Sequence, residues 1–177
     1  AVQAMGAIPV NVRDLGVDLM SFSGHKFYGP KGIGVLYIKG GTKPDKFMTG
    51  GHQERTMRGG TTNVPAVVGM AAALEKAVAH LGENYAYIKG MRDHFVERVK
   101  NEIPYIVYNG DEVDRLPQNA NFSFEFIEGE SILMSLDLAG IACSSGSACS
   151  SGSLEPSHVL LATGLPIEKA HGSIRFS

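Results

Sequence analysis

The chain has 177 residues, 44% of them hydrophobic, which is enough to build one sizeable domain or parts of two. The 16 Lys and Arg residues nearly balance the 18 Asp and Glu residues, and this argues against a nucleic-acid-binding protein, which should show a basic excess. The longest weakly polar run, residues 64–74, is shorter than the roughly 20 residues that a membrane span needs, and two cysteines are too few for a disulfide framework, so a reducing cytoplasm is the expected location.

The first distinctive segment is a glycine-rich turn between two apolar stretches. Residues 1–16 are expected to form a connector, and residues 17–22 and 33–38 are expected to be strands. Lys26 lies just past the end of the first strand, where packing can desolvate its amine and glycines let a flat cofactor approach, so it is well placed to form a Schiff base. Ser23 and His25 add donors that suit a phosphate. A solvated hairpin lysine is the alternative.

Residues 49–63 form a second glycine-rich segment, with two arginines and the adjacent Thr61 and Thr62. Such a loop suits phosphate or carboxylate recognition through backbone N–H groups, hydroxyls and guanidinium groups. A long flexible connector fits the same composition, and both interpretations stay open.

Two helices are expected next. Asn63 is a plausible N-cap and Pro65 suits the first turn of a helix that runs to about residue 81, where Gly82 is expected to end it. A second helix is predicted over residues 84–101, since its apolar residues recur at helical spacing and its other face is charged.

The rest of the chain alternates short strands and helices. Its expected strands are 105–108, 121–126, 141–142 and 174–176. Its expected helices are 129–138, ended by Gly140, and two short ones that begin at Pro156 and Pro166. This order predicts a small α+β unit, with a domain boundary near residues 82–90.

The serine-rich segment 143–156 contains both cysteines. Cys149 lies in its middle, where an exposed thiol should react, whereas Cys143 ends a strand and is expected to be a small buried residue. A zinc site needs about four ligands, which this sequence lacks at suitable spacing. A Cys143–Cys149 disulfide is disfavoured by a reducing compartment. A serine-rich linker with an incidental cysteine remains the inert alternative.

Four of these motifs together resemble those of the cysteine desulfurases of the NifS/IscS type, which are class V aminotransferase relatives and fold-type I pyridoxal-phosphate enzymes. The matching segments, in the order of that family, are 23–26, 53–61, 144–149 followed by 153–160, and 173–177. The lysine and cysteine motifs are the most specific of them.

The resemblance implies a role for five residues at the cofactor. Lys26 should hold pyridoxal phosphate covalently and later transfer the substrate proton. Gln3 should hydrogen-bond the phenolic oxygen of the cofactor. Ser23 and His25 should bind its phosphate, with His25 also counted among the catalytic residues, and Thr61 should reach the phosphate from the neighbouring subunit of a homodimer.

The resemblance also implies how the substrate, L-cysteine, is handled. Arg175 should bind its carboxylate, and Cys149 should take its sulfur as a persulfide and leave alanine. The acceptor should be an iron–sulfur scaffold protein of the NifU/IscU type, with neither nucleic acid nor membrane involved. No role is assigned to Cys143.

The implied fold class is α/β. Residues 1–83 should be the C-terminal portion of the large pyridoxal-phosphate-binding domain, and residues 84–177 a smaller α+β domain that carries the cysteine loop. Family members are considerably longer, so we expect a fragment that lacks N-terminal and C-terminal parts and is inactive alone. The alternatives are a selenocysteine lyase or other class V aminotransferase-type enzyme, and an inactive sulfur-carrier or interaction fragment.

Overall fold

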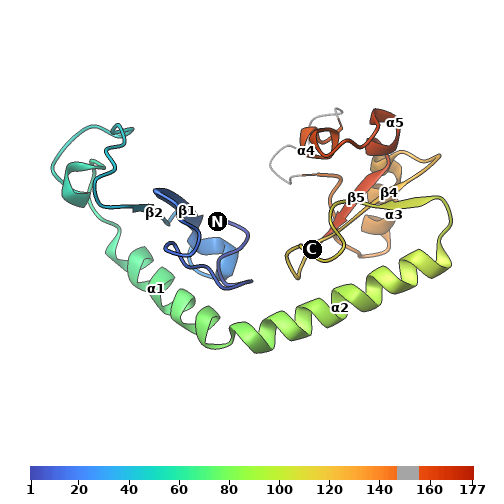
Figure 1. Ribbon diagram of the computed structural model, residues 1–177, viewed down its shortest axis with the longest axis horizontal. Coiled ribbons are helices and arrows are strands. Elements are labelled where there is room, and N and C mark those ends of the chain that lie inside the picture. Colours follow the sequence, from blue (N-terminus) through green and yellow to red (C-terminus); the bar gives the residue numbers. More distant parts are fainter. Residues whose placement is uncertain (147–155) are drawn as a thin grey trace. The chain divides into compact units, whose positions relative to one another are not determined.

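The computed structural model describes residues 1–146 and 156–177 and divides them into two compact units, Ala1–Tyr85 and Ala86–Ser177 (Figure 1). Both units mix helices with strands, as the expected α/β class requires. The assignment of residues 1–83 to a cofactor domain and of residues 84–177 to a small domain stays a prediction.

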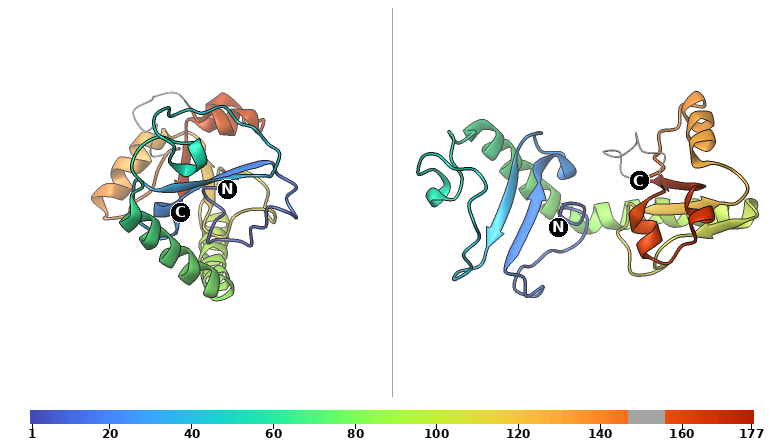
Figure 2. Two further views of the ribbon diagram at one scale, coloured as in Figure 1. Left: turned by 90° about the vertical axis from the view of Figure 1, so that its left-hand side faces the viewer. Right: turned by 90° about the horizontal axis from the view of Figure 1, so that it is seen from above.

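The first unit is built on an antiparallel pair of strands, β1 (Leu19–Ser23) and β2 (Gly34–Ile38), seen side by side in Figure 2. Leu19 lies opposite Ile38, and Ser23 opposite Gly34. The predicted strands are confirmed to within two residues. The segment between them holds one turn of 3-10 helix, η1 (Gly24–Phe27), which ends at Tyr28 with a left-handed φ of 67°.

The helix α1 (Val64–Ala79) begins as predicted, because the Asn63 side chain accepts a hydrogen bond from the Ala66 N–H (3.2 Å) and Pro65 lies in the first turn. The predicted end at Gly82 is wrong. The helix stops at Ala79, and α2 (Leu81–Glu102) begins two residues later with Gly82 in its first turn.

The break at His80 is short because hydrogen bonding continues on both sides of it. The His80 N–H donates to the Lys76 carbonyl (3.2 Å), and the His80 carbonyl accepts from the Asn84 N–H (3.0 Å). A glycine costs a helix only about 1 kcal/mol relative to alanine, which a helix as long as α2 tolerates. Among the described residues no single helix is long and apolar enough to cross a membrane, although α1 and α2 taken together meet the same length and composition criteria.

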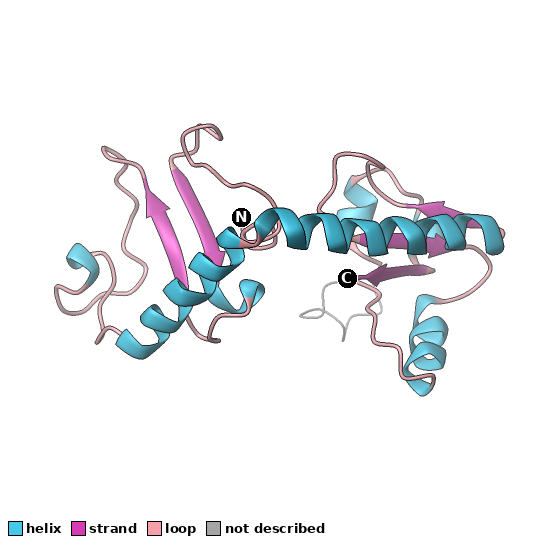
Figure 3. Cartoon of the chain, turned by 90° about the horizontal axis from the view of Figure 1, so that it is seen from below, coloured by secondary structure: helices cyan, strands magenta, loops and turns pink. Residues whose placement is uncertain are grey.

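The second unit contains a three-stranded antiparallel sheet in the order β3-β4-β5, with α2 along one face (Figure 3). The strands are β3 (Ile106–Tyr108), β4 (Ala120–Phe124) and β5 (Ser173–Phe176). Val99 of α2, Ala120 and Phe122 form the buried core, and the Phe95 ring of α2 lies 4.8 Å from the Phe176 ring, tilted by 58°. The unit's shorter helices are α3 (Gly129–Leu138), α4 (His158–Ala162) and α5 (Ile167–Ala170).

The α3 helix ends at Gly140 as predicted, with a left-handed φ of 75°. Its cap is a Schellman motif, because the Gly140 N–H donates to the Asp137 carbonyl (2.9 Å) and the Ile141 N–H to the Leu136 carbonyl (2.8 Å). The predicted strand at residues 141–142 is therefore wrong, since the backbone of Ile141 closes the helix. Extended pairing begins only at Ser144, which forms an isolated bridge with Arg175.

Candidate functional site

Lys26 lies on η1, directly after the strand β1. Two backbone hydrogen bonds close this turn: the Gly24 N–H donates to the Ile33 carbonyl, and the Gly29 N–H to the Gly24 carbonyl, both at 2.9 Å. The expected desolvation of the amine is wrong for this chain, because the Lys26 residue is exposed. The reason is geometric: β1 and β2 form a half-exposed hairpin, and Lys26 lies in the segment that connects them.

The turn packs against α1 so closely that the glycines at the contact cannot be replaced by larger residues without a clash. A Cβ at Gly24 would lie 3.2 Å from the Met70 Cγ, and a Cβ at Gly69 would lie 2.8 Å from the Pro30 Cγ. Phe27, only 3% exposed, packs beneath the turn. The position of Lys26 is thus fixed by backbone contacts although its side chain is in solvent.

Ser23 and His25 come together beside the lysine. The Ser23 Oγ lies 2.9 Å from the His25 Nδ1, so a hydroxyl, an imidazole and an ammonium group are gathered within one turn of chain. Such groups suit an anionic phosphate and a carbonyl that reacts with an amine. The residues present therefore fit a cofactor that carries both groups, as pyridoxal phosphate does.

The loop before α1 has more structure than its composition indicated. The two ends of the loop lie against each other, because the Gly59 N–H donates to the Met48 carbonyl (3.1 Å) and a Cβ at Gly59 would lie 2.9 Å from the Gly50 Cα. Within it, the 3-10 turn η2 (Glu54–Thr56) holds three successive non-glycine residues at left-handed φ values of 48°, 55° and 68°. Such a conformation costs a non-glycine residue about 1–2 kcal/mol, and strain of this kind clusters at functional sites.

The other residues predicted to bind the cofactor are both exposed. Gln3 lies in the turns ahead of β1, and Thr61 lies between η2 and α1, in the same unit as Lys26. One contact near Thr61 was not predicted from the sequence: within the loop before α1, the Gln53 Oε1 accepts a hydrogen bond from the Gly60 N–H (3.3 Å). The cofactor-binding roles of Gln3 and Thr61 stay predictions.

Arg175 lies in β5 of the second unit and is half-buried. Its Nε is fully buried and has no hydrogen-bond partner among the described residues. A buried donor without a partner is costly, and a guanidinium group pairs well with a carboxylate. The site therefore suits the predicted carboxylate ligand.

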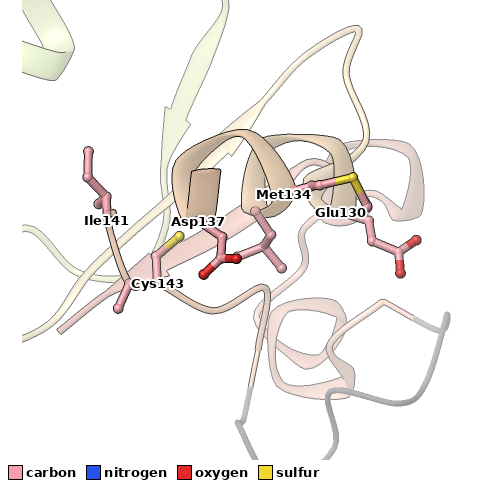
Figure 4. A pocket seen from close by; sticks show the side chains of 7 residues that line it. Glu130, Met134, Asp137, Ile141 and Cys143 are labelled. Atoms are coloured by element: carbon pink, nitrogen blue, oxygen red, sulfur yellow. The ribbon is translucent and has the colours of Figure 1, made fainter. Parts of the chain in front are cut away.

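The two cysteines differ in what the structure describes. Cys149, the predicted sulfur acceptor, lies outside the described residues. Cys143 is half-buried, and burial, helped by the negative charge of Asp137, raises the pKa of its thiol. Cys143 lines a hollow of about 440 Å³ beside α3. Figure 4 shows its side chain with those of Glu130, Met134 and Asp137. A thiol with a raised pKa is a poor nucleophile, which agrees with assigning Cys143 no role.

Comparison with known proteins identifies the family. The family model described as aminotransferase class-V matches residues 1–177. The chain belongs to the class-V aminotransferase family. Its curated relatives include the cysteine desulfurase IscS of Dictyoglomus turgidum, 54% identical over all of this chain and 45% of the relative, and that of Methanosarcina thermophila, 50% identical over all of this chain and 44% of the relative. The chain thus spans less than half the length of the curated relatives it matches.

Solved structures agree with this class-V assignment. A NifS-like protein superposes with a TM-score of 0.88 at 37% identity over all of this chain and 45% of the other, and the NifS-like protein of Rickettsia africae with 0.89 at 31% identity over 99% and 46%. These similarities confirm the resemblance to NifS/IscS-type proteins and the α/β, fold-type I class. Class-V aminotransferase and cysteine desulfurase relatives also imply pyridoxal phosphate as the cofactor.

Proposed function

We propose that the protein containing this chain is a pyridoxal-phosphate-dependent cysteine desulfurase. The observation that carries this proposal is the 54% and 50% identity, over the whole chain, to relatives named cysteine desulfurase. The donor cluster at Lys26 supports it because it suits the cofactor. The Arg175 Nε, which has no hydrogen-bond partner in the part of the chain that the structure describes, supports it because it suits an amino-acid carboxylate.

Each cofactor-binding residue has a distinct task in this proposal. Bound pyridoxal phosphate supplies an electron sink that weakens the bonds at the substrate Cα. Ser23 and His25 hold the phosphate, as does Thr61 from the second subunit of a homodimer, and Gln3 hydrogen-bonds the phenolic oxygen. The Lys26 amine anchors the cofactor and then carries the Cα proton.

The substrate is L-cysteine in this proposal. Arg175 binds its carboxylate, and the Cys149 thiolate attacks its sulfur. The Cβ–S bond of the substrate breaks, an S–S bond forms on Cys149, and a proton replaces sulfur at Cβ, so that alanine leaves and a persulfide remains. A solved neighbour, 32% identical with a TM-score of 0.74, is described as SspA in complex with cysteine.

The proposal extends to where the sulfur goes. We assign it to an iron–sulfur scaffold protein of the NifU/IscU type and place the enzyme in a reducing cytoplasm. The name IscS of the relatives and the low cysteine content of the chain support these two assignments.

The cofactor assignment can be tested by reductive labelling. The chain is incubated with pyridoxal phosphate, reduced with borohydride and digested, and the modified peptide is identified by mass spectrometry. We expect one label, on Lys26, that Lys26→Ala removes. Lys31→Ala is the matched control, because Lys31 is an exposed lysine in the same glycine-rich turn. Equal labelling of several lysines, unchanged in Lys26→Ala, would refute a specific site.

The reaction itself is tested on the complete protein by measuring alanine and enzyme-bound persulfide from L-cysteine. We expect Cys149→Ser to abolish both and Cys143→Ser to retain them. Full turnover by Cys149→Ser would favour an aminotransferase-type enzyme instead.

A further inference from the structure

The strand β5 has a partner on each of its two edges. On one edge it pairs with β4, where Asn121 lies opposite Arg175 and Ser123 opposite Ser173. On the other edge Arg175 forms an isolated antiparallel bridge with Ser144. Both bridge bonds are present: the Arg175 N–H donates to the Ser144 carbonyl (2.6 Å), and the Ser144 N–H donates to the Arg175 carbonyl (3.1 Å).

Two serine hydroxyls add to this bridge. Ser173, only 2% exposed, donates from its Oγ to the Ser145 carbonyl (3.3 Å). The Ser144 Oγ donates to the Gly146 carbonyl (3.0 Å) and accepts from the Gly146 N–H (3.3 Å). Residues 144–146 are therefore fixed to β5 and to one another at the point where the serine-rich segment begins.

We propose that Ser173 is a positioning residue that fixes the start of the cysteine-bearing segment against the strand that carries Arg175. The inference rests on the proposed function, because it needs a carboxylate on Arg175 and sulfur transfer to Cys149. Cys149 follows Ser145 by four positions in the sequence. The segment that carries the thiol therefore leaves the sheet from residues bonded to the strand that carries Arg175.

The expected effect falls on transfer and not on binding. Arg175 keeps its place in the sheet when the Ser173 hydroxyl is removed, so the affinity for the amino acid should not change. Loss of one hydroxyl-to-carbonyl bond loosens the start of the segment and lowers the fraction of time in which the thiol is well placed. A single bond of this kind corresponds to about a three- to tenfold fall in rate.

The test measures kcat and KM for L-cysteine in the complete protein for Ser173→Ala. The matched control is Ser135→Ala, which removes a hydroxyl-to-carbonyl bond of the same kind, from the Ser135 Oγ to the Ser131 carbonyl (2.9 Å), within α3. Ser144→Ala is a second variant that removes the bonds to Gly146 without entering the sheet, should Ser173→Ala fail to fold. Hydrogen exchange at residues 143–146 gives a readout that does not depend on activity.

We expect Ser173→Ala and Ser144→Ala each to lower kcat about three- to tenfold with KM within twofold, and to speed exchange at residues 143–146, while Ser135→Ala changes neither. An unchanged kcat, or a raised KM at normal kcat, overturns the inference and leaves the proposed function standing. If the unmutated complete protein releases no alanine from cysteine, the proposed function fails, and the inference fails with it.

Discussion

Gly29→Ala tests whether backbone contact shapes the turn that presents Lys26. A Cβ at Gly29 would lie 2.9 Å from the carbonyl oxygen of Gly24 and 3.2 Å from its carbonyl carbon. Both atoms belong to the backbone, so no side chain can rotate away. Relief requires the turn to open, which weakens the 2.9 Å bond from the Gly29 N–H to the Gly24 carbonyl.

The cost follows from these contacts. Overpacking costs about 1–3 kcal/mol and a weakened hydrogen bond about 1 kcal/mol, while the stiffer unfolded chain returns about 0.4–1 kcal/mol. We therefore expect a net destabilisation of about 2 kcal/mol, which corresponds to about 30-fold faster native-state hydrogen exchange.

The assay is hydrogen exchange of the chain followed by mass spectrometry. We expect the faster exchange to be confined to residues 19–38, with residues 104–124 unchanged as an internal reference. Gly40→Ala is the matched control, because no atom of the described residues lies within 4 Å of a Cβ at that position. Unchanged protection of residues 19–38 in Gly29→Ala would show that the close approach to Gly24 does not determine the turn.

Three further outcomes are expected. Thr56→Gly should raise the free energy of unfolding by about 1 kcal/mol in urea titrations, since Thr56 is a β-branched residue at a φ of 68°, and a loss of stability would contradict this. Because burial raises the pKa of Cys143, the folded state holds the thiol proton more tightly than the unfolded state. The rate of its alkylation by iodoacetamide should therefore be low at pH 7.5 and increase only well above the ordinary thiol pKa. The free energy of unfolding should fall as the pH rises through the pKa of this thiol in the unfolded state. Phe122→Ala should cost about 3–5 kcal/mol because Phe122 is fully buried, whereas Phe126→Ala, at a residue 88% exposed, should unfold at nearly the same urea concentration as the unmutated chain.

Local sequence signals predicted most of the elements. The start of α1 followed from Asn63 and Pro65, and the end of α3 from Gly140, because capping depends on a few neighbouring residues. The strands were found from their apolar patterns, which record which face is buried.

The errors arose where individual backbone hydrogen bonds at the helix ends decide. Gly82 looked like a helix end, but the break falls at His80, where bonding to both sides lets a new helix start. Ile141 looked like a strand residue, but its N–H completes the cap of α3. Patterns of apolar residues carry no information on such bonds.

The candidate site was predicted in part. The residues near Lys26 could be named from the sequence because they are neighbours in the chain, and the structure brings Ser23 and His25 into contact. The bridge from Ser144 to Arg175 joins residues 31 positions apart and had no local signal. The left-handed turn at Glu54–Thr56 was also missed, because these residue types normally avoid that conformation.

The alternation of β5 links the stability of the fold to its chemistry. Ile174 is fully buried and Phe176 packs against the core, while Ser173 and Arg175 alternate with them on the strand. A shift of the strand by one residue would exchange the two sets and bring the Arg175 guanidinium into the apolar core. The bulky hydrophobic residues therefore oppose a one-residue shift, which would also separate the arginine from Ser144. We conclude that inserting or deleting a single residue in this strand should prevent correct folding, whatever its effect on ligand recognition.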